Sequence, residues 1–186
     1  MSKSEYKKIL AAKKDAKEAL YKESYPDSNT KTPLLILFAP STGKEKSVYH
    51  ELLEGLKVLP MHVIVVADDE PADALKKPAG HFTWVNTESG RNDEKVLKYL
   101  QAADMALVFE EDHEMLRHIM DEGVVVIGND ISPMLENYQP NEETGNAFTY
   151  GSMNPWEIFR ALVRAYETNR FPYDWEHIIR GIFKNV

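Results

Sequence analysis

Two lysines in a polar loop are the first residues whose types and spacing could do chemistry. The stretch LLILFAPSTGKEKSVY, residues 34–49, leads from an apolar segment into this loop, which carries Lys44 and Lys46. Its layout invites comparison with the P-loop, G-x-x-x-x-G-K-[ST], in which glycines open the backbone, Lys holds phosphate and a hydroxyl ligates Mg²⁺. Phe38 stands in place of the first glycine and Glu45 in place of the hydroxyl. Because a carboxylate repels phosphate, the P-loop is excluded and the lysines need another role.

An acidic cluster is the second candidate, and it follows the apolar segment MALVFE. It consists of Glu110, Glu111, Asp112 and Glu114. Crowded carboxylates can hold a cation, or one of them can have a raised pKa suited to acid–base catalysis. The alternative is a solvated helix start, where negative charge interacts favourably with the helix dipole. The sequence leaves both interpretations open and favours the solvated start.

The segment HEMLRH invites comparison with a zinc-protease helix. The working motif is H-E-x-x-H, whose histidines are four residues apart and share one helix face. His113 and His118 are five residues apart, which places them about 140° apart around a helix. One metal ion cannot take both from a regular helix, so no metal site is expected and solvated histidines are the preferred interpretation.

Apolar runs alternate with amphipathic segments from residue 34 onward. We expect strands over 34–39, 62–67, 81–85, 105–110 and 124–128, a short sixth over 146–150, and helices over 45–58, 92–102 and 113–121. This alternation is typical of right-handed βαβ units. It predicts an α/β fold: a single doubly wound, Rossmann-like domain with a mostly parallel sheet of five to six strands and helices on both faces. A ligand would then lie beyond the carboxyl ends of the strands.

The remaining segments complete a predicted organisation of an N-terminal helix in 1–24, a linker over 25–33 and an α/β core over 34–186. The N-terminal helix should pack by a narrow stripe. Its members are Ile9, Ala12, Ala16, Ala19 and Leu20. Two helices close the core: Asn154 should cap the first, which buries Trp156, and Asp174 should cap the second, which buries Trp175.

Composition narrows the possible classes of protein and partner. The chain has 186 residues, a formal net charge of −8 and no cysteine. The charge argues against nucleic acid, because affinity for its phosphates comes mainly from Lys and Arg. No signal-peptide core and no stretch of ~20 apolar residues is present, so we expect a cytoplasmic protein without membrane contact. No resident cofactor is expected.

In this order of elements the chain resembles the C-terminal, donor-binding half of glycogen and starch synthases, two-domain GT-B glycosyltransferases. AKEALYKE resembles the helix that opens that half, and LKYLQAADMALVFE resembles a helix, a Gly-Ala-Asp turn and a strand of the family. GVVVIG and ETGNAFTY are similar to its next strand and its Thr-Gly-Phe turn. NPWEIFRALVRAYE and RFPYDWEHIIRGIF resemble its closing segments.

The resemblance also implies site residues. In the family, an Arg and a Lys after the first strand bind the donor's diphosphate. Lys46 falls on that Lys and Ser41 on that Arg, so a bidentate phosphate contact is lost, which Lys44 could replace in part as a point charge. The family's Glu-Pro-Cys-Gly-Leu supplies a Glu to the transferred sugar or its ribose. Glu110 or Glu111 is the counterpart here, without the Pro, Cys and Gly.

A further family loop, Thr-Gly-Gly, offers backbone amides to the donor and falls on Ile131, Ser132 and Pro133. Proline has no N–H to donate, and side chains replace the glycines.

Two hypotheses on function follow from the resemblance. The chain is the donor-binding half of an enzyme that transfers hexose from ADP-glucose or UDP-glucose to an α-glucan, inactive alone. Alternatively, it is a binding or scaffold protein with a degenerate site. Either implies an acceptor-binding partner chain or self-association, because an unpaired half exposes an apolar face.

Overall fold

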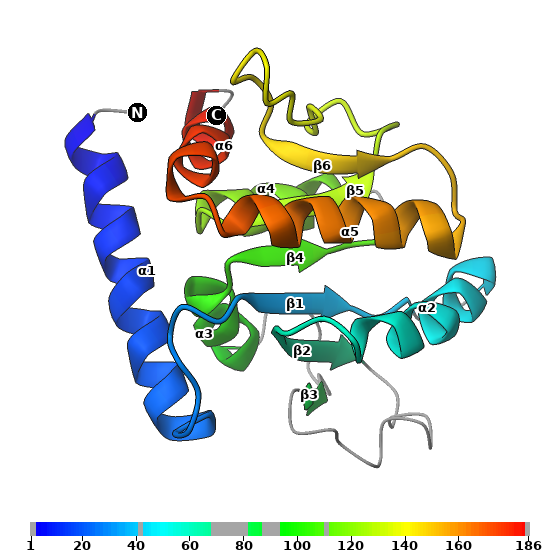
Figure 1. Cartoon of the computed structure of the whole chain (residues 1–186), viewed down its shortest axis with the longest axis horizontal. Coiled ribbons are helices and arrows are strands. Elements are labelled where there is room, and N and C mark those ends of the chain that lie inside the picture. The colour runs from blue at the N-terminus through cyan, green and yellow to red at the C-terminus, as the bar shows by residue number, and fades with distance from the viewer. Residues whose placement is uncertain (1–2, 41–42, 68–81, 87–93, 110–111, 185–186) are drawn as a thin grey trace.

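A parallel sheet between two layers of helices forms the body of the molecule. The structure, a computed structural model, describes residues 3–40, 43–67, 82–86, 94–109 and 112–184, with the side chains of 3–5, 44, 84 and 86 left out. The strands are β1 (Leu34–Phe38), β2 (His62–Ala67), β3 (Phe82–Asn86), β4 (Met105–Leu107), β5 (Val125–Asn129) and β6 (Ala147–Tyr150). They form one all-parallel sheet in the order β3-β2-β1-β4-β5-β6 (Figure 1). The predicted α/β Rossmann-like fold is confirmed.

The central strand β1 shows why continuous apolar runs became strands. All five of its residues are at most 3% exposed. Ile36 pairs with Ile64 of β2 on one side and with Ala106 of β4 on the other. A strand that is flanked by two strands and covered on both faces must be apolar at every position.

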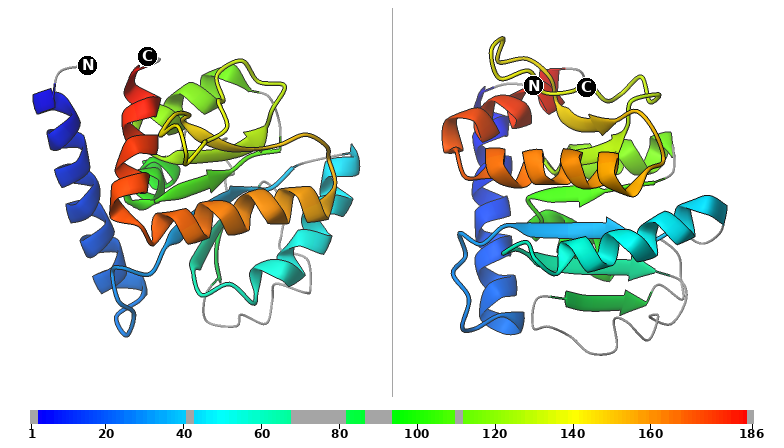
Figure 2. Two further views of the ribbon diagram at one scale, coloured as in Figure 1. Left: turned by 45° about the horizontal axis from the view of Figure 1, so that its top comes forward. Right: turned by 45° about the vertical axis from the view of Figure 1, so that its right-hand side comes forward.

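Two helices cover each face of the sheet. On one face lie α2 (Gly43–Leu56) and α5 (Pro155–Asn169), and on the other lie α3 (Glu94–Ala102) and α4 (His113–Asp121) (Figures 1 and 2). A Cβ added to Gly55 of α2 would lie 3.0 Å from the ring of Phe159 in α5. The missing side chain at Gly55 therefore lets these two helices approach closely.

The helix α1 (Lys3–Ser24) runs across the amino ends of the strands (Figure 1). The helix itself was predicted, but its packing stripe was partly wrong, because Ala12 and Ala19 are exposed. Aromatic residues do the packing instead: Tyr6 and Tyr21 are buried, and the Tyr21 hydroxyl donates to Thr32 O at 2.7 Å. Large side chains bury more apolar area per position than alanines and decide which edge faces inward.

A buried ion pair fixes α1 to the sheet. Lys17 Nζ lies 2.6 Å from Asp104 Oδ2, and both side chains are less than one-fifth exposed. The same carboxylate oxygen accepts the Leu34 N–H at 2.7 Å. Asp104 therefore connects α1 with the first residue of β1, just before its own strand β4 begins.

A second lysine of α1 meets the carboxyl ends of two helices. Lys13 Nζ donates to Leu100 O of α3 at 3.4 Å and to Glu122 O, at the end of α4, at 3.3 Å. A cation there interacts favourably with both helix dipoles. Burial lowers the pKa of Lys13 to about 8, although the charges of Asp104 and Glu122 act in the opposite direction.

The two closing helices, α5 and α6 (Pro172–Lys184), form as expected, with two corrections. Asn154 caps α5 by accepting the Trp156 N–H, and Trp175 of α6 is buried, as predicted. Trp156, however, is 79% exposed, so its assignment to the core was wrong. The α6 helix begins at Pro172, so Asp174 lies inside its first turn and accepts the Tyr138 hydroxyl at 2.9 Å instead of capping the helix. Among the described residues, no helix is both long and apolar enough to cross a bilayer.

Candidate functional site

The strand order determines where a ligand site should lie. From β1 the chain moves outward through β2 to β3, and it then returns to place β4 on the other side of β1. The connections that follow β1 and β4 therefore diverge to opposite faces of the sheet. In open α/β sheets the crevice at such a switch point, beyond the carboxyl ends of the strands, is where ligands bind.

The connection after β1 leads into α2 and carries the lysine. Ala39 N donates to Val66 O at 2.9 Å, which continues the pairing with β2 past the last strand residue. Gly43 begins α2 with φ +79°, a backbone conformation that favours glycine. Lys46 follows within the first turns of α2 and is half-buried. A lysine at a helix start adds its charge to the unsatisfied N–H groups there, which is suitable chemistry for an anion.

The connection after β4 is held from several sides. Val108 N donates to Ile127 O at 3.0 Å, and the Tyr150 hydroxyl donates to Val108 O at 2.9 Å in a fully buried contact. Asp112 caps α4, where its carboxylate accepts the Glu114 and Met115 N–H groups at 3.0 and 3.1 Å. For Asp112, the interpretation as a helix-start carboxylate is therefore confirmed.

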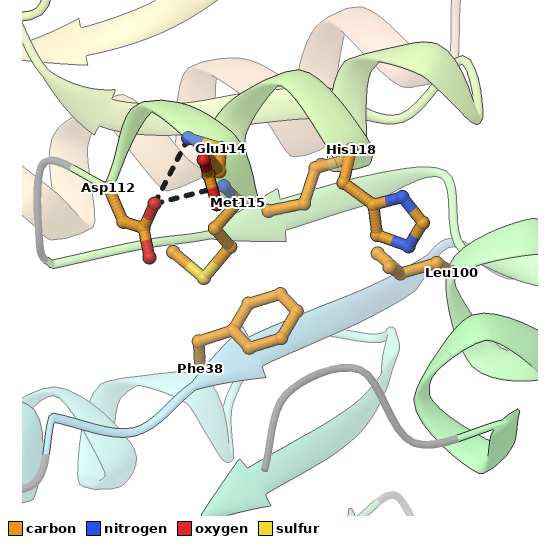
Figure 3. A pocket seen from close by; sticks show the side chains of 7 residues that line it. Phe38, Leu100, Asp112, Glu114, Met115 and His118 are labelled. Atoms are coloured by element: carbon orange, nitrogen blue, oxygen red, sulfur yellow. Dashed lines mark hydrogen bonds between the residues drawn. The ribbon is translucent and has the colours of Figure 1, made fainter.

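A cleft of about 330 Å³ opens between the end of β1 and the helices of the second face (Figure 3). Its lining consists of Phe38, Leu100, Asp112, Glu114, Met115, His118 and Ile119. In Figure 3, the ring of Phe38 faces Met115, and His118 lies opposite Leu100. The wall formed by Phe38 and Leu100 is therefore apolar, whereas the wall formed by α4 carries carboxylates, an imidazole and the thioether of Met115.

A second hollow, of about 530 Å³, lies along the other side of α4. It is lined by His113, Glu114, Arg117, His118, Asp121 and Met134. Glu114 and His118 line both hollows, so α4 presents them between the two. In the part of the chain that the structure describes, no three His, Cys, Asp or Glu residues gather closely enough to hold a metal ion.

His118 is the residue that sequence reasoning missed. It was assigned to the solvated helix surface, but it is half-buried and lines the cleft. Its spacing carried the signal: three residues after Met115 and one before Ile119, it lies at the edge of the apolar stripe of α4. Edge positions of a stripe often line the gap between neighbouring helices.

In the turn after β5, the backbone N–H groups donate to acceptors within the same turn. The Ile131 N–H donates to Asn129 Oδ1 at 3.1 Å, and the Ser132 N–H donates to Asn129 O at 3.4 Å. The next residue, Pro133, has no N–H. Ile131 is 67% exposed, whereas Ser132 is buried. This turn, which the family resemblance places over a donor-binding loop, offers no free amide from these three residues.

The predicted site residues differ in how far the structure describes them. Ser41, Glu110 and Glu111 lie outside the described residues. Lys44 is described by its backbone alone, as the second residue of α2, and Lys46 is described in full. The structure thus places Lys46 on α2, beyond the carboxyl end of β1, and the roles assigned to all five residues remain predictions.

Tyr49 lies one turn after Lys46 on α2. Its ring packs edge-on against Phe109 at the end of β4, with 6.3 Å between the ring centroids. Burial raises the pKa of its hydroxyl above the usual range, and within the described part of the chain this hydroxyl has no hydrogen-bond partner. The tyrosine therefore connects the two diverging connections by packing.

The comparison with solved structures finds a similar fold. The crystal structure of WaaG, a glycosyltransferase involved in lipopolysaccharide biosynthesis, matches with a TM-score of 0.56 and 16% sequence identity. The match covers 89% of this chain and 46% of that chain, so this chain spans about half the length of that enzyme. No protein-family model and no curated protein sequence matches. At this identity the likeness shows the fold alone: the chain is folded like about half of WaaG.

Proposed function

We propose that this chain binds a nucleotide sugar at the crevice between the β1 and β4 connections, as the donor-binding half of a glycosyltransferase like glycogen and starch synthases. The observation that carries the proposal is the strand order 3-2-1-4-5-6, with a cleft beside the switch point, in a fold like half of a known glycosyltransferase. The donor would be ADP-glucose or UDP-glucose, and the acceptor an α-glucan. Transfer would require a separate acceptor-binding chain.

In this proposal Lys46 neutralises the donor's diphosphate. A diphosphate leaving group gains charge as the glycosidic bond to it breaks, so a cation there stabilises the transition state more than the ground state. Lys44 would add a second charge, and Ser41 would stand where the family has an Arg. Glu110 or Glu111 would contact the transferred sugar or the ribose.

A second candidate function is a non-catalytic binding or scaffold role with a degenerate site. The turn after β5 favours it, because Ile131 and Ser132 use their amides within the turn and Pro133 has none. A donor-binding loop of the family type needs free amides for the sugar and phosphates. The two candidates differ in one measurable property, affinity for the nucleotide sugar.

Isothermal titration of ADP-glucose, UDP-glucose, ADP and UDP into the purified chain tests the proposal. We expect binding by at least one of them and a loss of about tenfold to hundredfold in affinity in Lys46→Ala, because a charge-assisted contact contributes ~1.5–3 kcal/mol. The matched control is Lys22→Ala, which removes an exposed lysine of α1 at the other end of the sheet and should leave the affinity unchanged. Absence of heat with all four ligands would contradict donor binding and leave the scaffold role.

A further inference from the structure

The most exposed large apolar side chain among the described residues lies at the carboxyl-end edge of the sheet. Trp156 occupies the first turn of α5 and is 79% exposed, whereas the inward face of the same helix is formed by Ile158 and Leu162, both fully buried. The helix α5 begins just after β6 ends (Figure 1). The Trp156 N–H is held by the Asn154 side chain at 2.9 Å. A rigid, capped helix start thus presents an indole to solvent.

Two carboxylates meet at Gly151, in the connection that leads to this helix start. Glu157 Oε2 accepts the N–H groups of Gly151 and Ser152 at 3.2 and 3.0 Å, which holds the side chain next to Trp156 in one position. Asp130 approaches Gly151 from the end of β5: a Cβ added to Gly151 would lie 3.3 Å from Asp130 Oδ2. Glycine at this position therefore lets two acidic side chains from different connections gather at one place.

The indole and the two carboxylates indicate which kind of ligand would bind at this edge of the sheet. A pyranose ring has an apolar C–H face, which stacks on an indole, and hydroxyls around its rim, which donate to carboxylates. Charge narrows the choice of ligand further, because the carboxylates of Asp130 and Glu157 at Gly151 disfavour an anionic ligand at this place. A second copy of this chain is disfavoured on the same ground, since it would bring the same carboxylates.

We propose that Trp156 is a stacking platform for a neutral pyranose ring of a glycan, with Glu157 and Asp130 as acceptors for its hydroxyls. The proposal rests on the proposed function in one respect: this glycan would be the acceptor of the proposed transfer, whose reacting end the separate acceptor-binding chain would hold. Ile131, which follows Asp130 in the chain, is also exposed.

Native affinity electrophoresis in gels that contain glycogen, soluble starch, dextran or heparin tests this proposal. The wild-type chain should be retarded by at least one neutral glycan and not by heparin. Trp156→Ala should weaken the retardation about twofold to tenfold, since aromatic stacking contributes ~0.5–1.5 kcal/mol beyond burial. Trp156→Tyr should retain part of it. The matched control is Phe171→Ala, which removes another exposed aromatic side chain, 58% exposed, and should leave retardation unchanged.

The same variants separate this proposal from the proposed function. Titration of nucleotide sugars into Trp156→Ala should give the wild-type affinity, because Lys46 is intact. Retardation by heparin alone, no retardation by any glycan, or equal losses in Trp156→Ala and Phe171→Ala would overturn the platform. So would sedimentation showing wild-type oligomers that Trp156→Ala dissolves, since the indole would then belong to a protein interface.

Discussion

The two ends of the sheet are built differently. At the amino ends, α1 closes the sheet, and the Lys17–Asp104 pair is nearly buried with a distance of 2.6 Å. At the carboxyl ends lie the start of α4, from which the two hollows extend along the helix, and the exposed side chains of Ile131 and Trp156. One end satisfies its charged groups internally, whereas the other presents polar and apolar groups to solvent. The difference indicates that the amino ends carry stability and the carboxyl ends are available for a ligand.

The largest effect on the free energy of unfolding is expected at the amino ends of the sheet. Asp104→Ala should lower the free energy of unfolding by about 3–5 kcal/mol, because it leaves the Lys17 ammonium buried without its partner and removes the acceptor of the Leu34 N–H. Urea denaturation followed by circular dichroism measures this. Asp130→Ala, the matched change at the carboxyl ends, should cost less than about 0.5 kcal/mol because Asp130 is exposed. Equal losses of the free energy of unfolding in Asp104→Ala and Asp130→Ala would contradict the difference between the two ends of the sheet.

A smaller effect should appear as a pH dependence at the same end. The pKa of Lys13 is lowered from 10.5 to about 8, first by burial, so between these values the unfolded chain holds a proton that the folded chain has released. Unfolding then takes up protons, and the free energy of unfolding rises with pH. We expect a rise of about 1 kcal/mol between pH 7 and pH 9, and urea melts of the wild type at several pH values measure it.

Lys13→Met supplies the control for this pH dependence. Without the titrating amine, the free energy of unfolding should lose most of its rise between pH 7 and pH 9. Measurements should stay below pH 10, because burial raises the pKa values of Tyr21, Tyr25 and Tyr49, and their loss of protons on unfolding lowers stability above that pH. An identical slope in Lys13→Met would show that another group causes it.

The smallest effect on stability is expected at the carboxyl ends. Trp156→Ser should change the free energy of unfolding, measured by urea denaturation, by less than about 0.5 kcal/mol, because the indole is exposed. The change should instead show in glycan retardation, as proposed above. A loss of several kcal/mol would mean that Trp156 packs against the fold, and it would remove the distinction between the two ends.

Much of the fold followed from the sequence because buried parallel strands have a simple signature. Strands such as β1 and β5 are apolar at successive positions, and their limits were predicted to within a residue or two. Trp156 was misplaced for a definite reason. The inward face of α5 is formed by Ile158, Leu162 and the small Ala161 and Ala165, and the larger tryptophan suggested a different face.

The site was harder to predict, because it depends on how connections meet in space. The hollows around α4 are bounded by side chains from β1, α3 and the turn after β5, which spacing along the chain cannot bring together. His118 was therefore overlooked. The Ile131 N–H is occupied by an Asn129 side chain whose direction no sequence pattern indicates, and the Ser132 N–H by the Asn129 carbonyl.

The strand order has a consequence for how the molecule folds. Leu34 and Asp104, which join the starts of β1 and β4, are 70 residues apart, whereas β1 pairs with β2 and β4 with β5 over shorter separations. Long chain closures cost entropy and slow folding. We therefore expect the β1–β2–β3 and β4–β5–β6 halves to assemble separately and to join last. The crevice that we propose as the ligand site lies at that seam, so an incompletely folded chain would lack it.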